Sequence, residues 1–451
     1  MQKRSNFSSK IGFVLAASGS AVGLGNIWRF PYLAAKYGGG TFLLTYVVLA
    51  VTFGFTLMTA EIALGRRTGL SAIGAFSALD KRFGFLGILA AVIPIIIFPY
   101  YSVIGGWVLK YFSVFISGNM KAATGDDYFT GFITNSVSPL LWFFLFIALT
   151  AIIVLLGVEK GIEKVSKIMM PILVLLSLII AVYTITLDGA KEGLIYYLRP
   201  RMSDFSAKTI LAAMGQMFYS MSLAMGIMIT YGSYMKKDDN LEGSVHQIEI
   251  FDTGIAFLAG LMIIPAVFVF SGGDKSALGA GPGLMFITLP KVFASMKFGG
   301  FIGTIFFIMV FFAALTSAIS LMETIVSIFR DKFHWSRKFA CVFVTVLSLI
   351  LGSLSSLGFG PLSSVSWHGM SILDIMDFIS NSILMPILAL FTCIFVGFII
   401  KPDVISDEVR VSGGTFKSEK LFTVMIKWIA PILLVVILAS SIATGLGLFS
   451  L

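Results

Sequence analysis

The sequence predicts an all-α polytopic membrane protein, on the evidence of its composition and of one repeated pattern. Of the 451 residues, 57% are hydrophobic and only 12% are charged, an apolar share well above that of ordinary soluble domains. The mean hydropathy is +0.97. Eleven apolar stretches are long enough to cross a hydrocarbon core of about 30 Å, which takes about 20 residues of helix. They are continuously apolar rather than alternating in polarity, so we expect helices and not a closed β-barrel.

The eleven expected spans follow one another without a linker or low-complexity segment, so we expect one transmembrane domain over 1–451. They lie at 11–34, 41–65, 84–115, 139–157, 162–186, 209–235, 246–272, 298–330, 337–356, 373–400 and 422–449. The distribution of Lys and Arg between alternate loops predicts a cytoplasmic N-terminus and, after eleven spans, an external C-terminus. The connection at 273–297 contains an apolar run at 279–290, for which we expect a short re-entrant or surface helix.

The charge and the reactive residues argue against several classes of protein. The net charge of +9 is spread over loops, which indicates membrane topology rather than nucleic-acid binding. Cys341 and Cys393 both lie in apolar spans, where core packing explains them better than a disulfide. The three histidines are far apart in sequence, and no Gly-x4-Gly-Lys phosphate loop is present. We therefore expect neither an enzyme nor an ATP-driven pump.

The first span is irregular: "SGSAVGLGNIWRFP" at 18–31 carries three glycines together with Asn26 and Arg29. Each glycine weakens a helix by about 1 kcal/mol relative to alanine. A broken helix offers main-chain N–H groups to an anion and free carbonyls to a cation, as in transporters with discontinuous helices. Close helix packing through Gly19 and Gly23 is the alternative. The polar residues favour a binding site.

Two further spans carry polar interruptions. The sixth contains "GQMFYSMSLAMG" at 215–226, five spans after the first irregularity, which is the spacing expected of an inverted repeat. The eighth places Thr316 and Ser317 side by side, and hydroxyl oxygens suit a small monovalent cation. Hydrogen bonding back to the same helix is the alternative in both spans. In the eighth span, hydrogen bonding between helices is a further alternative. A charge at mid-membrane costs at least about 2.5 kcal/mol. Each ionisable residue inside an expected span therefore needs a partner or a role. These residues are Arg29, Glu61, Asp252, Glu323, Asp374 and Asp377.

Six motifs, in the right order, resemble those of one known family, the neurotransmitter:sodium symporters, in its bacterial amino-acid branch. They are "AVGLGNIWRFPY", "YGGGTF", "YYSVIGGW", "GQMFYSMSLAMG", "FAALTS" and "DIMDF". The resemblance covers nearly the whole chain. It implies the leucine-transporter fold, with a five-plus-five inverted repeat at 11–186 and 209–400, broken helices 1 and 6, and an extra helix at 422–449. It also implies sodium-coupled import of a neutral L-amino acid across a bacterial inner membrane.

The resemblance implies one substrate site beside two sodium ions. Substrate contacts would fall on Ala21, Gly23, Leu24, Gly25, Ile97, Tyr101, Tyr219, Ser220, Ser222, Met225, Ser317 and Leu321. The first sodium would be held by Ala21, Asn26, Ser220 and Asp252, and the second by Gly19, Val22, Ala313, Thr316 and Ser317. Because the side-chain pocket would be apolar, the expected substrate is a hydrophobic or aromatic amino acid.

The resemblance also implies two gates. Arg29 would pair with Asp377 above the substrate, and Arg4 would pair with Asp331 on the cytoplasmic side. Glu61 would brace the broken sixth span. Glu323 receives no role.

The chain departs from the family pattern at Asp252, where many members carry Asn. A fixed carboxylate can supply the negative charge that chloride supplies in animal members, so we expect two sodium ions and no chloride. Phe7 replaces a Trp near the inner gate, and Ala224 replaces a Gly near the substrate side chain. The alternatives left open are a proton-coupled carrier, a nutrient sensor and a channel. The expected partners are the amino acid and the lipid bilayer, with no nucleic acid, and the chain is expected to be a monomer or a weak dimer.

Overall fold

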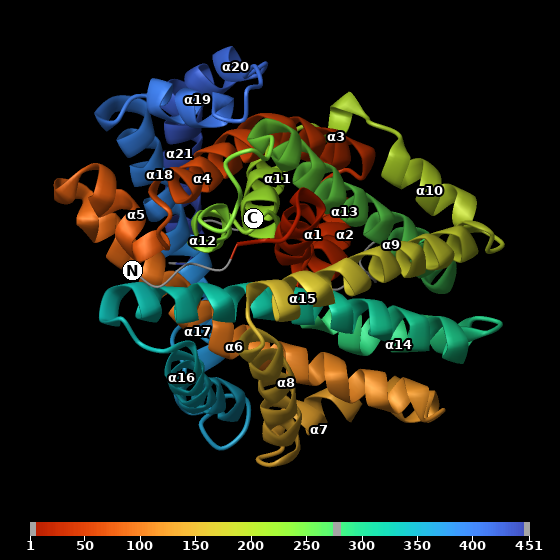
Figure 1. The fold of residues 1–451 in the computed structure, drawn as a ribbon. Helices are drawn as coiled ribbons and strands as arrows, with labels where there is room; N and C mark the ends of the chain where they lie inside the picture. The colour runs from red at the N-terminus through yellow and green to blue at the C-terminus, as the bar shows by residue number, and fades with distance from the viewer. Residues whose placement is uncertain (1–5, 274–280, 446–451) are drawn as a thin grey trace.

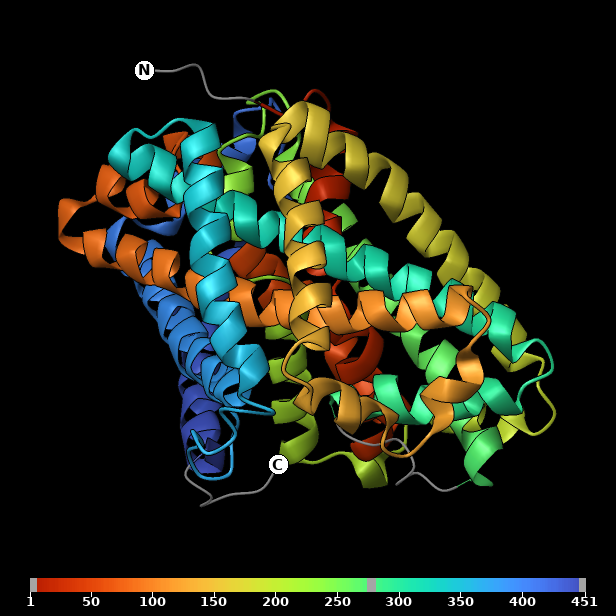
Figure 2. The same cartoon turned by 90° about the horizontal axis from the view of Figure 1, so that it is seen from below.

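The computed structural model describes residues 6–273 and 281–445 and is nearly all helical (Figures 1 and 2). Within those residues, nine helices are long and apolar enough to cross a membrane, and a tenth span is obtained if one bent pair counts as a single crossing. The expected class, an all-α polytopic membrane protein, is confirmed. The count of eleven spans stays a prediction.

Each expected span coincides with helix, and most boundaries lie within a few residues of the expected ones. The long segments are α1 (Lys10–Ala21) with α2 (Phe30–Lys36), α3 (Gly40–Leu49) with α4 (Phe55–Thr68), α6 (Gly84–Ile116), α8 (Ser138–Leu155), α9 (Lys164–Ile185), α11 (Ala207–Ser220) with α12 (Ile227–Gly232), α13 (Leu241–Ser271), α15 (Gly299–Phe333), α16 (Arg337–Leu357), α17 (Ile372–Asp377) with α18 (Met385–Ile394), and α20 (Glu419–Val424) with α21 (Ala430–Gly445). Helix α13 begins five residues before the expected 246 because the Asn240 side chain caps it, accepting from the Gly243 N–H.

Shorter helices lie between these segments. They are α5 (Ala72–Leu79), α7 (Tyr128–Thr134), α10 (Ala190–Leu198), α14 (Leu289–Ser295) and α19 (Pro402–Arg410). The expected helix at 279–290 falls partly outside the described residues, but an apolar helical segment does run over Leu284–Ser295.

The first span is bent by 55° between α1 and the segment Gly25–Lys36. Helix α1 ends because Val22 adopts an extended conformation, with φ −72° and ψ 97°. The sixth expected span is divided between α11 and α12. Ser222 and Ala224, in the connection, both have φ of +54°, and Gly226 has φ of +72°, values that no continuous right-handed helix contains.

Helix α15 lies at the centre of the molecule. It contacts α1, α6, α8, α9 and α16, and in Figure 1 it crosses the middle of the fold between α6, α8 and α16 on one side and α1 and α9 on the other. Of its most apolar stretch, 83% is buried. Thr316 and Ser317 therefore face other helices and not lipid.

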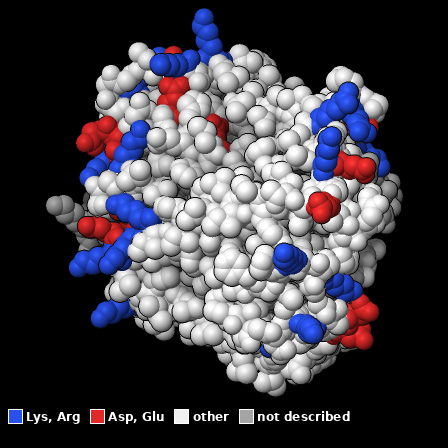
Figure 3. Space-filling view, turned by 90° about the vertical axis from the view of Figure 1, so that its right-hand side faces the viewer, with Lys and Arg blue, Asp and Glu red and all other residues white. Residues whose placement is uncertain are grey.

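The surface has the character of a membrane protein. Figure 3 shows a broad face almost without charge between two bands of Lys, Arg, Asp and Glu. Large apolar side chains are exposed on the helices, among them Ile152 on α8 and Val182 on α9. An exposed apolar belt of this kind is what lipid tails cover.

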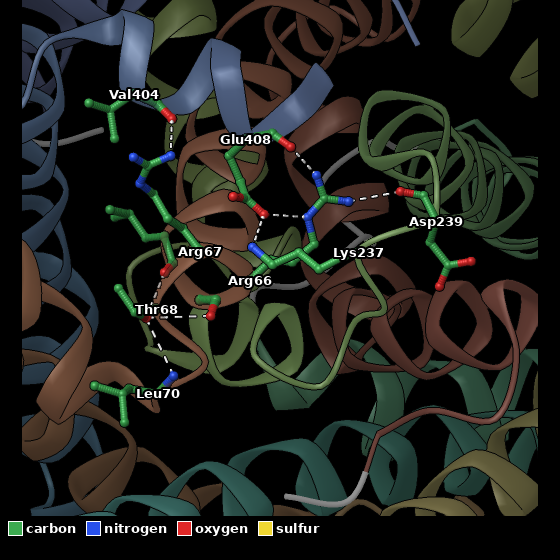
Figure 4. A network of polar contacts seen from close by, with 10 residues as sticks. Arg66, Arg67, Thr68, Leu70, Lys237, Asp239, Val404 and Glu408 are labelled. Atoms are coloured by element: carbon green, nitrogen blue, oxygen red, sulfur yellow. Dashed lines mark hydrogen bonds and ion pairs between the residues drawn. The ribbon is translucent and has the colours of Figure 1, made fainter. Parts of the chain in front are cut away.

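A buried ion cluster fastens α19 to the end of α4 (Figure 4). The Arg66 Nε lies 2.8 Å from Glu408 Oε1, and the Lys237 Nζ lies 2.7 Å from the same oxygen. Arg66 also donates to the main-chain carbonyl of Asp239 at 2.8 Å. The side chains of Arg66 and Glu408 are 0% and 2% exposed. The cluster thus joins α4, α19 and the α12–α13 connection.

Candidate functional site

The two helix breaks meet at one small cavity of about 30 Å³. Its walls come from the break after α1, the break after α11, and helices α6 and α15. All twelve residues expected to contact substrate line it, together with Ser20, Asn26 and Ile227. The structure thus brings the whole predicted substrate set together, and its role in binding stays a prediction.

The glycines of the first break allow a close approach of main chain to side chains. A Cβ atom on Gly25 would lie 2.7 Å from Tyr219 Cε1, and one on Gly23 would lie 3.0 Å from Ser317 Oγ. Gly19 serves packing, since its Cβ would lie 3.2 Å from Thr316 Cβ. The glycines thus differ by position: Gly19 packs against α15, whereas Gly23 and Gly25 border the cavity, where their role in binding stays a prediction.

Asp252 of α13 is fully buried and collects the polar groups of the predicted first sodium set. Its Oδ1 accepts from Asn26 Nδ2 at 2.8 Å and from Ser220 Oγ at 2.7 Å. Asn26 also donates to the Asp252 carbonyl at 3.2 Å. Both helix breaks are thus tied to one carboxylate, and Ala21 borders the same cavity.

Sequence reasoning missed Tyr46, which satisfies the second oxygen of Asp252. The Tyr46 hydroxyl donates to Asp252 Oδ2 at 2.9 Å and lies 3.4 Å from Ser220 Oγ. Tyr46 is fully buried on α3. A tyrosine within an apolar span was the available signal, because a buried hydroxyl needs a partner.

Ser317 of α15 faces the carbonyls that α1 leaves free where it ends. Its hydroxyl lies 3.1 Å from the Ser20 oxygen and 3.4 Å from those of Gly19 and Val22. Thr316 Oγ1 donates to the carbonyls of Phe312 and Ala313, at 2.9 and 3.2 Å. The five residues of the predicted second sodium set therefore lie together as a group of hard oxygen atoms, and the back-bonding alternative also holds for Thr316.

Polar main-chain groups face the cavity from both breaks. The Leu24 N–H lies 3.5 Å from the Tyr101 hydroxyl. Ser222 Oγ donates to the Ser20 carbonyl at 2.9 Å. Glu61 braces the second break as expected, since its Oε1 accepts from the Ala224 N–H at 2.7 Å. Ala224, expected near the substrate side chain, does not line the cavity.

Above this cavity a larger one of about 390 Å³ contains both expected outer-gate residues. Within the described residues, Arg29 and Asp377 form no ion pair. The Arg29 guanidinium instead lies over the Tyr219 ring, 5.4 Å from its centroid. Asp377 Oδ1 accepts from the Tyr100 hydroxyl at 3.0 Å and from Asn381 Nδ2 at 2.5 Å. Tyr219 lines both cavities.

On the opposite side, aromatic rings close the fold around Phe7. Its ring centroid lies 5.6 Å from those of Phe13 and Tyr231 and 6.1 Å from that of Tyr234. Of the expected inner gate, Arg4 lies outside the described residues, and Asp331 accepts from the Ser71 N–H at 2.7 Å.

Glu323, which had no role in the sequence analysis, is a fully buried ion-pair partner. It binds the Arg337 guanidinium and accepts from the Tyr234 hydroxyl at 2.8 Å. Arg337 also donates to the Val154 carbonyl. The pair therefore joins α8, α15 and α16 to the end of the broken sixth span.

Comparisons with known proteins identify the family of this chain. The model of the sodium:neurotransmitter symporter family matches residues 4–141 and 130–446. The chain belongs to this family. Among relatives, the uncharacterized sodium-dependent transporter YhdH of Bacillus subtilis is 36% identical over 97% of both chains. An uncharacterized sodium-dependent transporter of Haemophilus influenzae is 33% identical, over 98% of this chain and 99% of the relative.

A solved structure has the same fold. The crystal structure of MhsT in complex with L-phenylalanine matches with a TM-score of 0.87 and 40% identity, over 97% of this chain and 100% of that one. As a member of the sodium:neurotransmitter symporter family, the chain is a membrane transporter that uses sodium and not an enzyme. The family predicted from the six sequence motifs is confirmed.

Proposed function

We propose that this protein is a sodium-coupled symporter that imports a neutral hydrophobic or aromatic L-amino acid. The observation that supports it most strongly is the convergence of two broken spans on one cavity. Two of its lining residues, Asn26 and Ser220, donate to the Asp252 carboxylate, and a third, Ser317, faces a group of carbonyl oxygen atoms. The match to MhsT, whose structure contains L-phenylalanine, supports the same substrate class.

The main-chain groups of the breaks suit a zwitterion. The N–H groups of Leu24 and Gly25, at the start of the second half of the first span, would receive the carboxylate together with the Tyr101 hydroxyl. Carbonyls near Ala21, Tyr219 and Ser220 and the Ser222 hydroxyl would receive the amine. This part of the site recognises any α-amino acid and leaves selectivity to the side-chain pocket.

The side-chain pocket is apolar. Ile97, Met225, Ile227 and Leu321 border the cavity, and no described residue that lines it carries a charge. A charged substrate side chain would lose its hydration there without a partner. Met225 is flexible and can adapt to side chains of different shape.

Two sodium ions would bind beside the substrate. One would be held by the Ala21 carbonyl, Asn26, Ser220 and Asp252, completed by the substrate carboxylate. Its affinity and that of the substrate then rise together, because coupling between two sites is reciprocal. The second would be held by the carbonyls of Gly19, Val22 and Ala313 with the hydroxyls of Thr316 and Ser317. Each sodium charge gains about 2.3 kcal/mol per 100 mV on entry, which drives uptake against a gradient.

The Asp252 carboxylate supports independence from chloride. It is fully buried, and three side chains donate to it. A fixed negative charge beside two cations performs the balancing role of an anion. We therefore propose that no chloride is transported or required.

The conformational cycle would alternate two gates around this fixed site. Closing the outer cavity would bring Arg29 to Asp377, and Arg4 with Asp331 would close the other side. The proposed arrangement is a single domain of two inverted repeats, 11–186 and 209–400, in a bacterial inner membrane with the N-terminus in the cytoplasm and the C-terminus outside. The proposed oligomeric state is a monomer or a weak dimer.

Uptake into proteoliposomes tests the proposal. Labelled amino acids are offered with sodium, potassium or choline outside and with chloride or gluconate as the anion. Concentrative uptake of a hydrophobic amino acid in sodium, unchanged in gluconate, supports the proposal. Uptake that persists in choline under a proton gradient overturns the sodium assignments in favour of a proton-coupled carrier. Flux without accumulation indicates a channel, and binding without flux indicates a sensor.

A further inference from the structure

Four ionisable side chains follow α13 from its first turn to the proposed first sodium site. They are Glu242, His246, Glu249 and Asp252, at intervals of four, three and three residues, which place them in one row on a helix. Asp252 belongs to the proposed first sodium site. The proposed sodium site has no need of His246 or Glu249.

Glu249 is a buried carboxyl group with one oxygen unsatisfied. Its Oε2 lies 3.0 Å from His246 Nδ1, and its side chain is 4% exposed. Its Oε1 is buried and has no hydrogen-bond partner among the described residues. An ionised carboxylate in this position is costly, whereas a protonated one is not.

His246 connects this buried group to the surface. Its side chain is 45% exposed, and its ring stacks on Phe55 of α4 with centroids 4.7 Å apart and planes inclined by 14°. Phe416 lies beyond Phe55, with ring centroids 6.5 Å apart. The stacked ring holds Nδ1 toward Glu249 while the rest of the imidazole stays accessible.

Charged groups of α13 and of the neighbouring α1 lie near this pair. From α1, the Lys10 Nζ lies 3.7 Å from the position that a Cβ would take on Gly243, three residues before His246. Within the described residues, Glu242 acts on His246, and Asp252 acts on Glu249. Glu242 is itself engaged, since its carboxylate accepts from the N–H groups of Lys417 and Ser418 at 3.1 and 2.8 Å. The neighbouring helix α4 presents the aromatic ring of Phe55 to the pair.

We propose that His246 and Glu249 form a proton-binding site that releases a proton when sodium binds beside Asp252. A cation one helical turn away favours the ionised form of Glu249 by direct attraction. Without that cation, the unsatisfied Oε1 favours the protonated form. Sodium and the proton therefore each weaken the binding of the other through electrostatic repulsion, although they occupy different groups.

The proton has a complete route. It passes from Glu249 Oε2 to His246 Nδ1, which leaves a carboxylate and an imidazolium. The imidazolium then gives its Nε2 proton to water at its exposed edge, and the neutral ring remains. The inference rests on the proposed function, because it requires sodium to bind beside Asp252.

Proton release on sodium addition tests the proposal directly. The purified full-length chain is placed in weakly buffered solution with a pH indicator dye, and sodium chloride is compared with choline chloride. The wild-type chain is expected to release about one proton per sodium-binding event between about pH 6 and about pH 8, the range in which a histidine pair exchanges protons. Glu249→Gln is expected to abolish this release. Glu242→Gln, the same change seven residues earlier on α13, is expected to retain it.

The pH dependence of sodium binding provides a second readout. The sodium concentration for half-maximal stabilisation against heat is expected to rise about five- to tenfold from about pH 8 to about pH 6 in the wild type, a typical coupling between linked sites. In Glu249→Gln the rise is expected to be below about twofold. Glu249→Asp, which keeps the carboxyl group, is expected to restore the wild-type behaviour.

Two results overturn the inference. Release from Glu249→Gln equal to that of wild type places the proton elsewhere, and sodium-dependent stabilisation without any proton release in the wild-type chain shows that the pair does not titrate. The latter measurement does not depend on the folding of a variant. Absence of any sodium-dependent stabilisation would instead refute the proposed function.

Discussion

Replacing Thr316 with valine tests whether Thr316 is a sodium ligand or an ordinary threonine that bonds only to its own helix. Thr316 Oγ1 donates to Phe312 and Ala313 carbonyls of its own helix at 2.9 and 3.2 Å. Thr324, eight residues further along α15, donates to the Ser320 carbonyl at 2.8 Å. Both side chains are buried, at 2% and 0% exposure. Thr→Val keeps the shape and removes the hydroxyl at either position.

The expected magnitude follows from what each hydroxyl contacts. Loss of the bond to the helix is common to both variants and costs about 1 kcal/mol. Thr316 would in addition lose its contact with a cation, and an interaction with a charged group is worth about 1.5 to 3 kcal/mol. That difference corresponds to roughly 10- to 150-fold in sodium affinity. Thr316→Val should therefore weaken sodium binding strongly, and Thr324→Val should not.

The assay is the sodium concentration that gives half-maximal amino-acid uptake in proteoliposomes at a fixed membrane potential. Thermal unfolding of both variants, measured without sodium, controls for the loss of the shared hydrogen bond. Equal shifts in the two variants, or a shift below about threefold for Thr316→Val, would show that this hydroxyl is no ligand and that back-bonding alone explains it.

Three further substitutions, and one control substitution, test other parts of the structure. Asp252→Asn removes the proposed internal anion, so uptake should become stimulated by chloride, and equal rates in chloride and gluconate would contradict this. Glu408→Ala leaves Arg66 buried without its partner and should lower the free energy of unfolding by about 3 to 5 kcal/mol. The control Glu419→Ala, at the exposed pair with Arg410, should lower it by less than about 1 kcal/mol. The melting temperatures of the two variants measure the difference. Burial, with a contribution from neighbouring Asp238, raises the pKa of Asp239, so its ionised form costs stability above that pKa. Asp239→Asn should therefore stabilise the chain at neutral pH and lose this advantage as the pH falls through the raised pKa, which melting curves at several pH values would show.

Much of the site could be predicted because its residues are unusual where they stand. The hydrocarbon core of a membrane disfavours residues that break helices or carry polar groups. The first span nevertheless contains glycines, Asn26 and Arg29, and α13 contains Asp252. Such conflicts mark functional positions, because a membrane gives polar groups no other reason to persist. The same reasoning identified Glu323 without finding its role. Its partner Arg337 lies beyond the end of α15 and is recognised only when α16 folds back.

The sequence by itself determined the class of this protein and the positions of its helices, because continuous apolar runs permit only one local structure in a bilayer and need no knowledge of packing. The resemblance of its motifs to one family also predicted the residues that line the cavity between the two breaks. The tertiary structure alone decided which groups satisfy one another. Tyr46 reaches Asp252 across 206 positions, and Arg29 lies over Tyr219 instead of pairing with Asp377. Glu249 keeps one oxygen without a partner among the residues that the structure describes. Such contacts depend on the orientation of whole helices, which the packing of the bundle fixes and no local pattern records.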